Sequence, residues 1–265
     1  MKVKDIYQYI DHIAPFSTQL DYDNAGLLMG SENVELQRVL VTLDVTLEVV
    51  KEAVRKKCQL IVSHHPLIFH GLKAVIPDDP TGAAVLELAR RDIALISAHT
   101  NLDQACGGVS DVLLERLGIA PEGFLEPAGQ TADGKPYGMG AVGMLETAMD
   151  PKSFAKHVKT ALNARGARAV LGDRPVKKVA VCGGAGGDLL SRAAAWGADA
   201  YVTADVKYHE FLEAYQRGIT LVDGGHFATE DPAMDMLCQR LKGAFEQDGV
   251  EFFRTQKHKE VYFTL

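Results

Sequence analysis

The chain has 265 residues, of which 47% are hydrophobic and 24% charged. This ordinary globular composition excludes disorder, collagen and coiled coil as its main character, and the length suffices for one large domain or two smaller ones. The 28 basic and 35 acidic side chains give a formal charge of −7, which argues against broad binding to nucleic acid or to an anionic membrane surface.

The sequence carries no signal for a membrane or an oxidising compartment. No apolar run approaches the roughly 18 residues that a membrane-spanning helix needs. Residues 1–15 predict an amphipathic helix rather than a signal peptide. The four cysteines are widely spaced and form no CxxC pair, so neither a disulfide framework nor a zinc ribbon is indicated. We therefore expect a cytoplasmic protein with reduced thiols.

In the first half of the chain, short β-branched runs alternate with helical stretches. Strands are predicted at residues 38–44, 58–66 and 92–100, and helices at 47–57 and 81–91. This alternation favours a parallel or mixed sheet that is covered by helices.

The second half repeats the pattern. The predicted strands are 138–145, 177–184, 198–205 and 219–226, and the predicted helices are 151–166, 188–197, 210–218 and 232–245, the last with Pro232 near its first turn. No low-complexity linker separates the halves, which favours interlaced rather than beaded units.

The two halves can be laid over each other. Residues 93–98 match 219–224, and in both copies a histidine and then a carboxylate follow the strand, with the spacing His-x-x-x-acid. Chance similarity of hydrophobic strands is the alternative, but the shared polar spacing favours duplication. We predict an α/β protein of two interlaced, duplicated repeats, residues 1–125 and 126–265, with mixed sheets covered by helices. The loop at 71–82 has no counterpart in the second half.

Imidazoles and carboxylates gather at three predicted strand ends, where open α/β sheets bind ligands. They are His64 and His65, His99 and Asp103, and His226 and Glu230. Five of these six groups would supply three nitrogens and two carboxylates, one of which could bridge two metals. Such a donor set without thiolate selects Zn, Mn, Fe, Co or Ni. Two divalent ions, two carboxylates and a bridging hydroxide would leave a site of about +1, suited to an anionic substrate.

Each motif also has a structural interpretation. A His-His pair is often a surface or core feature, His226 and Glu230 would be neighbours on any helix, and Asp103 could favour a helix start. The glycine-rich segment 183–187 could cradle a phosphate or form a tight turn. Asp205, Lys207 and His209 could orient substrate and shuttle protons, or form an ion pair and a cap. The gathering at three strand ends favours a metal site.

Six ordered motifs between residues 23 and 230 match a known family. They are Asp23-Asn24-x-Gly26-Leu27, Ser63-His64-His65-Pro66-Leu67, His99-Thr100-Asn101-Leu102-Asp103, Val181-Cys182-Gly183-Gly184-x-Gly186, Asp205-x-Lys207-Tyr208-His209 and Gly225-His226-x-Ala228-Thr229-Glu230. In these segments the sequence resembles the Nif-three-like proteins, also called GTP cyclohydrolase I type 2 homologues or dinuclear metal centre hexameric proteins.

The resemblance implies two interlaced repeats, two divalent metal ions per chain and a homohexamer built as a trimer of dimers. Carried over residue by residue, the implied metal ligands are His64, His65, Asp103, His226 and Glu230, with Glu230 as a bridge. His99 would lie behind the ligands or face the substrate. The chain resembles the short form that lacks a central inserted domain. It departs from the pattern at Tyr22, Ala141 and Ala204, none of them an implied ligand.

The first functional hypothesis is a dinuclear-metal hydrolase of the GTP cyclohydrolase I type 2 homologue family. A metal-bound hydroxide would attack a nucleotide-like small molecule, His99 or His209 would move protons, and Asp205 and Lys207 would bind the substrate. The alternative is a non-enzymatic regulatory, metal-delivery or scaffold protein. Nucleic-acid binding is a weaker hypothesis because the basic residues are scattered.

Overall fold

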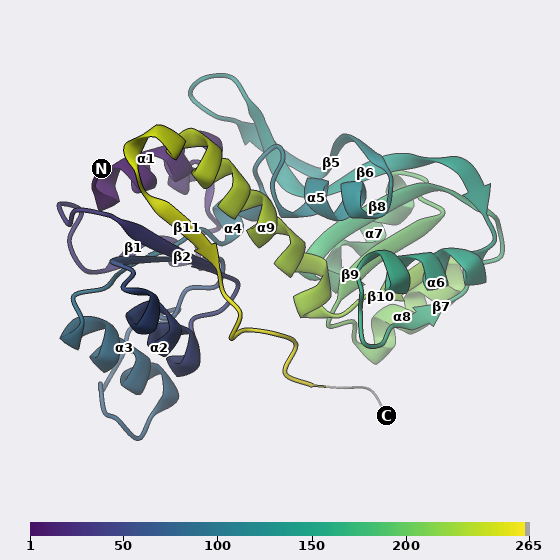
Figure 1. The fold of residues 1–265 in the computed structure, drawn as a ribbon. Coiled ribbons are helices and arrows are strands. Elements are labelled where there is room, and N and C mark those ends of the chain that lie inside the picture. Colours follow the sequence, from purple (N-terminus) through teal and green to yellow (C-terminus); the bar gives the residue numbers. More distant parts are fainter. Residues whose placement is uncertain (263–265) are drawn as a thin grey trace. The chain divides into compact units, whose positions relative to one another are not determined.

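The computed structural model describes residues 1–262, apart from the side chain of residue 246, and divides into two compact units (Figure 1). Unit 1 comprises Met1–Leu102 and Met234–Lys259, and unit 2 comprises Asp103–Ala233 and the segment from Glu260. The units have other bounds than the predicted repeats 1–125 and 126–265, because the segment from Met234 returns to unit 1. The repeat boundaries themselves stay a prediction.

The sheet of unit 1 has five strands, and the predicted mixed character is confirmed. Its order is β1 (Gly26–Met29), β4 (Ala94–Ser97), β3 (Leu60–Ser63), β2 (Arg38–Thr42) and β11 (Glu251–Arg254). The strands β4, β3, β2 and β11 are parallel neighbours, and β1 pairs antiparallel with β4. Three consecutive strands of the chain thus end at one edge of this sheet.

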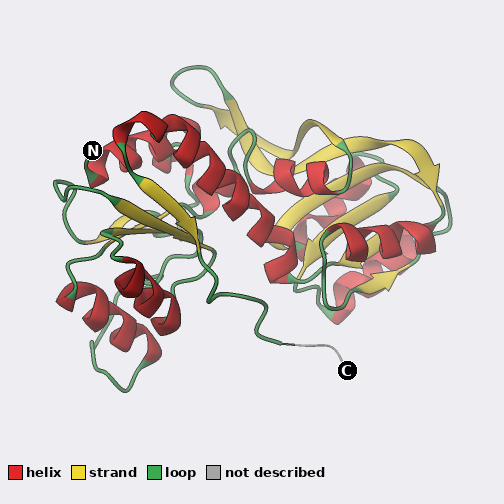
Figure 2. Ribbon diagram, viewed as in Figure 1, coloured by secondary structure: helices red, strands yellow, loops and turns green. Residues whose placement is uncertain are grey.

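Helices cover both faces of this sheet (Figures 1 and 2). On one face, α2 (Leu47–Lys56) and α3 (Pro80–Arg90) pack their apolar residues against Leu40, Ile61 and Leu95. The alternate strand residues face the other side, where α1 (Val3–Ile13) and the C-terminal part of α9 lie. The Thr46 and Asp79 side chains cap α2 and α3 by accepting hydrogen bonds from Val49 N and Gly82 N.

Unit 2 contains a six-stranded mixed sheet. Its order is β5 (Ala120–Gln130), β6 (Pro136–Met149), β8 (Val176–Ala185), β9 (Ala200–Ala204), β10 (Thr220–Asp223) and β7 (Arg168–Val170). Only β8, β9 and β10 are parallel, and the flanking pairs are antiparallel. The parallel centre corresponds to the strands that the sequence predicted, whereas β5 and β7 were not predicted.

Alternate residues of β8 divide the interior of unit 2 into two cores. Val179 and Val181 belong to the core under α5 (Val109–Arg116) and α6 (Pro151–Ala161). Ala180 and Cys182 belong to the core under α7 (Leu190–Ala195) and α8 (Tyr208–Arg217). This period of two is the signature of a strand buried on both faces. Short 3-10 turns at Phe16–Thr18, Gly187–Leu189 and Glu246–Asp248 complete the elements.

Two helices begin where the sequence predicted strand ends or loops. The single turn α4 (Thr100–Asp103) follows β4, and α9 (His226–Ala244) begins at His226 rather than at residue 232. Pro232 therefore lies inside α9 instead of in its first turn. A proline removes only one helical donor, and here it did not stop the helix. The early start places His226 and Glu230 on one helical turn.

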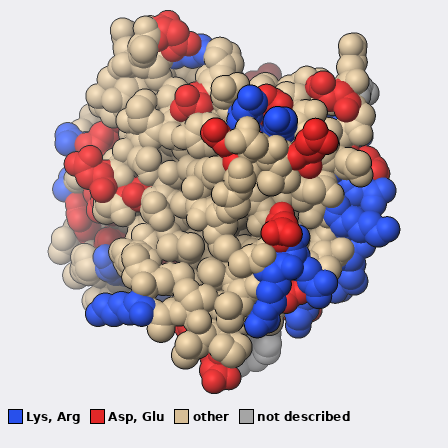
Figure 3. Space-filling view, turned by 90° about the vertical axis from the view of Figure 1, so that its left-hand side faces the viewer, with Lys and Arg blue, Asp and Glu red and all other residues tan. Residues whose placement is uncertain are grey.

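Within residues 1–262, no helix combines the length and apolar character needed to cross a membrane. In the face shown in Figure 3, charged side chains of both signs lie mostly around the edge, and the centre is largely uncharged. This face therefore carries no continuous stripe of basic side chains across it. The predicted cytoplasmic location stays a prediction.

Candidate metal centre

Three histidines of unit 1 converge at the carboxyl ends of two neighbouring parallel strands. β3 ends at Ser63, so His64 and His65 both lie beyond the strand, as Pro66 indicated. His99 follows β4. The ring centroids lie 4.9 Å (His64–His65), 5.1 Å (His64–His99) and 5.4 Å (His65–His99) apart. Their potential ligand nitrogens lie within 4.8 Å of one another, which is close enough for a shared metal ion.

The Nδ1 atom of each of these rings has a fixed oxygen partner. His64 Nδ1 lies 2.7 Å from the Ala98 carbonyl oxygen, and His64 is fully buried. His65 Nδ1 lies 2.8 Å from Asp44 Oδ1. His99 Nδ1 lies 2.7 Å from Asp23 Oδ1. A carbonyl oxygen accepts only, so Nδ1 of His64 carries the hydrogen and its Nε2 carries the lone pair. Metal-binding histidines commonly show this arrangement.

The two supporting aspartates are ionised at neutral pH. Burial alone would raise the pKa of Asp23, but hydrogen bonds from His99 and Thr100 outweigh it and hold that pKa well below its usual range. Burial opposes ionisation of Asp44 in the same way, and hydrogen bonds from His258 and His65 outweigh it, so the pKa of Asp44 is also low. Because an ionised carboxylate only accepts, His65 and His99 also donate through Nδ1 and keep the lone pair on Nε2.

Unit 2 presents carboxylates together with one histidine. His226 and Glu230 lie four residues apart on one face of α9, with His226 Nε2 3.0 Å from Glu230 Oε2. Glu230 is buried. Asp103 ends α4, and one of its carboxylate oxygens lies within 4.8 Å of one from Glu230. Behind His226, Nδ1 lies 2.7 Å from Asp205 Oδ2, so this ring is supported in the same way as those of unit 1.

The glycine-rich segment 183–187 makes room for these carboxylates. Gly184 has a φ of +63°, and a Cβ there would lie 2.1 Å from Glu230 Oε1 and 3.2 Å from His226 Nε2. A Cβ on Gly187 would lie 2.1 Å from Glu210 Oε2. Close approach to carboxylates therefore accounts for these two glycines. The tight-turn interpretation is favoured over a phosphate cradle.

The donor set fits a borderline or hard divalent metal. All the converging groups are imidazoles and carboxylates, which suit Zn, Mn, Fe, Co or Ni. Cys182 is the thiol close to this region, but burial, and then the charges of Asp103 and Glu230, raise the pKa of its thiol. It stays protonated and belongs to the apolar core, so thiolate coordination is disfavoured. These imidazoles and carboxylates could hold metal ions.

Comparison with known proteins identifies the family. Residues 1–260 match the model described as Duf34/NIF3 (NGG1p interacting factor 3). The chain belongs to the NIF3 family. A Clostridium perfringens protein named "GTP cyclohydrolase 1 type 2 homolog" is 32% identical over 264 residues, covering 99% of each chain. A Clostridium acetobutylicum protein of the same name is 31% identical and covers 94% of this chain and 93% of its own.

Solved structures of NIF3 relatives agree with this assignment. A hypothetical protein of Staphylococcus aureus has a TM-score of 0.93 and 30% identity, with coverage of 100% of this chain and 99% of that one. A Bacillus cereus protein described as related to NIF3 also has a TM-score of 0.93, with 26% identity and the same coverage. The resemblance that the sequence motifs indicated is confirmed.

In this NIF3 chain, the residues predicted to bind substrate or move protons are dispersed. Asp205 contacts His226, which favours a role in positioning that ring. Lys207 precedes α8 and is exposed, with its Nζ 4.0 Å from Glu210 Oε1. His209 is also exposed and has its Nε2 3.9 Å from the same oxygen. His99 instead joins His64 and His65, so it is a candidate ligand as well as a proton carrier. The assigned roles of all four stay predictions.

Three residues of the centre were missed by the analysis of the sequence. Asp44 follows β2 and could have been found by the same strand-end rule that found His64. Asp23 was noted only as part of a motif, and nothing in the spacing links it to His99, which is far away in the chain. His258 lies after β11, and its Nε2 is 2.7 Å from Asp44 Oδ2. That contact depends on the return of the C-terminal segment to unit 1.

Proposed function

We propose that this chain is a metal-dependent hydrolase that holds two divalent ions and acts on a nucleotide-like small molecule. The proposed ligands are His64, His65, Asp103, His226 and Glu230, as the family resemblance implies. The supporting observation is that four imidazoles each have Nδ1 held by a carbonyl or carboxylate oxygen. Purely structural histidines rarely need such uniform support, whereas metal ligands do.

A single helical turn connects two of the candidate groups. His99 ends the histidine group of unit 1, and Asp103 is the first residue of unit 2. They are separated by α4 alone. A helical rise of about 1.5 Å per residue brings the two within about 6 Å along the helix axis. A histidine and a carboxylate are therefore delivered together by one local turn.

The residues around the centre would have different roles in the reaction. When bound, two divalent metals activate water and polarise the group that it attacks. Asp44 and Asp205 would fix the orientation of His65 and His226. With its Nδ1–H donated to Asp23, His99 would accept a proton at Nε2 from a reacting group and return it to the leaving group. Buried Glu230 would balance the positive charge of the centre.

Elemental analysis of gently purified protein tests the metal part of this proposal. We expect about two equivalents of metal per chain, and a loss of most of it in the His65→Ala, Glu230→Ala double variant. The matched control is His157→Ala, Glu146→Ala. His157 is a half-buried imidazole that bonds a backbone carbonyl, and Glu146 is exposed. Near-zero metal after reconstitution of the wild type would contradict the proposal.

Turnover tests the hydrolase part. GTP consumption by protein loaded with Mn, Zn or Fe should be abolished in the double variant and unchanged in the control. Equal turnover in the wild type and the double variant would show that the activity belongs elsewhere. Bound metal without turnover of GTP or other nucleotides would instead favour the regulatory, metal-delivery or scaffold role. The homohexamer, a trimer of dimers, stays a prediction that light scattering can test.

A further inference from the structure

A long loop of unit 1 lines an open cavity beside the histidine group. The loop runs through residues 64–79, between β3 and α3, and the cavity has a volume of about 510 Å³. The corresponding connection in unit 2, between β9 and α8, consists of residues 205–207 alone. Long loops without secondary structure are uncommon in compact domains and are usually functional. The loop is thus an addition to the first half that needs an explanation.

Aromatic rings connect this cavity to His99. Phe69 lines the cavity, and its ring centroid lies 6.0 Å from that of His99 and 4.6 Å from that of His70. Asn24 Nδ2 donates to the Ile68 carbonyl oxygen at 2.5 Å, while the preceding Asp23 holds His99. One two-residue segment therefore fixes both the loop and the histidine. Phe69 forms a wall shared by the cavity and the candidate metal centre.

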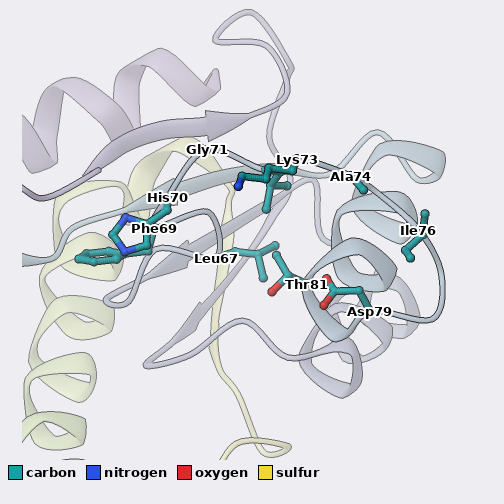
Figure 4. A pocket seen from close by; sticks show the side chains of 10 residues that line it. Leu67, Phe69, His70, Gly71, Lys73, Ala74, Ile76, Asp79 and Thr81 are labelled. Atoms are coloured by element: carbon teal, nitrogen blue, oxygen red, sulfur yellow. The ribbon is translucent and has the colours of Figure 1, made fainter.

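The far end of the cavity is tied to the start of α3. Asp79 Oδ2 accepts the Gly82 backbone hydrogen at 2.7 Å and caps α3. A Cβ on Gly82 would lie 2.3 Å from the Ile76 carbonyl oxygen, so the loop packs directly on the first turn of α3. Figure 4 shows Phe69 and His70 at one end of the cavity and Asp79 and Thr81 at the other, with Lys73 between them. Such a preformed cavity costs a ligand little ordering on binding.

Lys73 is a cation available to a ligand. It lines the cavity in an exposed part of the loop, and within the described residues no carboxylate lies within 4.0 Å of its ammonium group. The lining carboxylate, Asp79, is already engaged with Gly82. A cavity lined by this ammonium and by the rings of Phe69 and His70 favours a ligand that is both flat and anionic.

We propose that this cavity binds the base and phosphate of a nucleotide and so delivers the substrate to the metal centre. The ring of the base would stack on Phe69, and a phosphate would pair with Lys73. The volume lies within the usual range for small-molecule sites, about 300–1,000 Å³. Stacking on aromatic side chains tolerates different bases, so the cavity would select the class of compound rather than one base. The delivery rests on the proposed function, whereas the binding does not.

Calorimetric titration of the full chain with GMP tests the proposal. We expect Phe69→Leu and Lys73→Met each to raise the Kd for GMP about tenfold while the metal content stays unchanged. The matched control, Lys4→Met, removes an exposed lysine of the same unit whose backbone N–H, not its ammonium, is the bonded group. Inorganic phosphate is the second probe, and its weaker binding should respond to Lys73→Met and not to Phe69→Leu. Added salt should reduce the effect of Lys73→Met.

Two outcomes would overturn the proposal. One is a Kd for GMP that neither substitution changes, and the other is no GMP binding by wild-type protein with its full metal complement. Both leave the metal centre intact, so they separate failure of the cavity from failure of the proposed function. The latter would show instead as missing metal or missing turnover.

Discussion

In unit 1 the carboxylates stand behind the histidines, whereas in unit 2 the carboxylate of Glu230 stands beside the histidine. The supports also differ in exposure. The Asp23 side chain is 0% exposed, that of Asp44 is 38% exposed and that of Asp205 is 55% exposed. Charge interactions weaken as solvent screens them. A carboxylate that holds a histidine ring should therefore contribute more to metal affinity in unit 1 than in unit 2. In unit 2 we expect the position of the carboxylate ligands themselves to contribute more.

The largest effect should come from Gly184→Ala in unit 2. The new Cβ would collide with Glu230 Oε1 and displace a buried proposed ligand. We expect metal affinity, measured by competition with a chromophoric chelator, to fall by about 100-fold. Gly118→Ala is the matched control, because Gly118 has a φ of +73° and open space around its Cβ position. It should lower the free energy of unfolding by about 1 kcal/mol and leave the metal affinity unchanged. Equal metal affinity in both variants would refute carboxylate placement by Gly184.

Asp23→Asn should give the next largest effect, on folding stability in unit 1. The variant loses charged hydrogen bonds to His99 and Thr100, and we expect a loss of about 2–3 kcal/mol in unfolding free energy at pH 7. The folded-state pKa of Asp23 lies well below its usual range, so its stabilisation is complete above the unfolded value of about 3.9 and is lost as the pH falls through the folded value.

Denaturant titration of the metal-free protein checks this prediction at pH 7 and again below pH 4. The gap between wild type and Asp23→Asn should shrink at the lower pH. The exposed neighbour Asp21 supplies the control variant, Asp21→Asn, which should match the wild type at both values. A stability gap that widened on acidification would contradict the lowered pKa assigned to Asp23.

The candidate metal ligands could be named from the sequence because each follows a predicted strand, and chain order alone predicts that such strand ends converge. The supports did not follow, because contacts such as His99 with Asp23 join distant residues. β5, β7 and β11 were also missed. β11 pairs with β2 only after the chain has passed through unit 2, a tertiary relation without a local signal. The start of α9 at His226 was missed because Pro232 suggested a first turn, whereas the helix accommodates it.

A paired comparison of Asp44→Asn with Asp205→Asn tests the effect of exposure directly. Each substitution removes the charge behind one proposed ligand, His65 or His226. We expect metal affinity to fall about tenfold or more for Asp44→Asn, as for other histidine supports. For the more exposed Asp205, we expect a fall of about threefold, in the range of solvent-exposed ion pairs. Equal losses would mean that exposure does not set the strength of the support.

An effect as small as that of Asp205→Asn should come from His258→Ala. The His258 side chain is 8% exposed and its Nε2 lies 2.7 Å from Asp44 Oδ2, while Asp44 Oδ1 contacts His65. The C-terminal segment is held in place just before this residue, where the Thr255 hydroxyl donates to Glu52. We expect a fall in metal affinity of about threefold, because the imidazole orients Asp44 rather than a metal.

A double-mutant cycle decides whether His258 acts through Asp44. If it does, His258→Ala should lower metal affinity in the wild type and have no further effect in the Asp44→Asn background, because the group that it orients has lost its charge. Additive losses would mean that His258 reaches the centre by another route. The non-additive result would show that the network supporting the histidines of unit 1 includes the last segment of the chain that returns to it. Among residues 1–262, no second side chain supports Asp205 in the way that His258 supports Asp44.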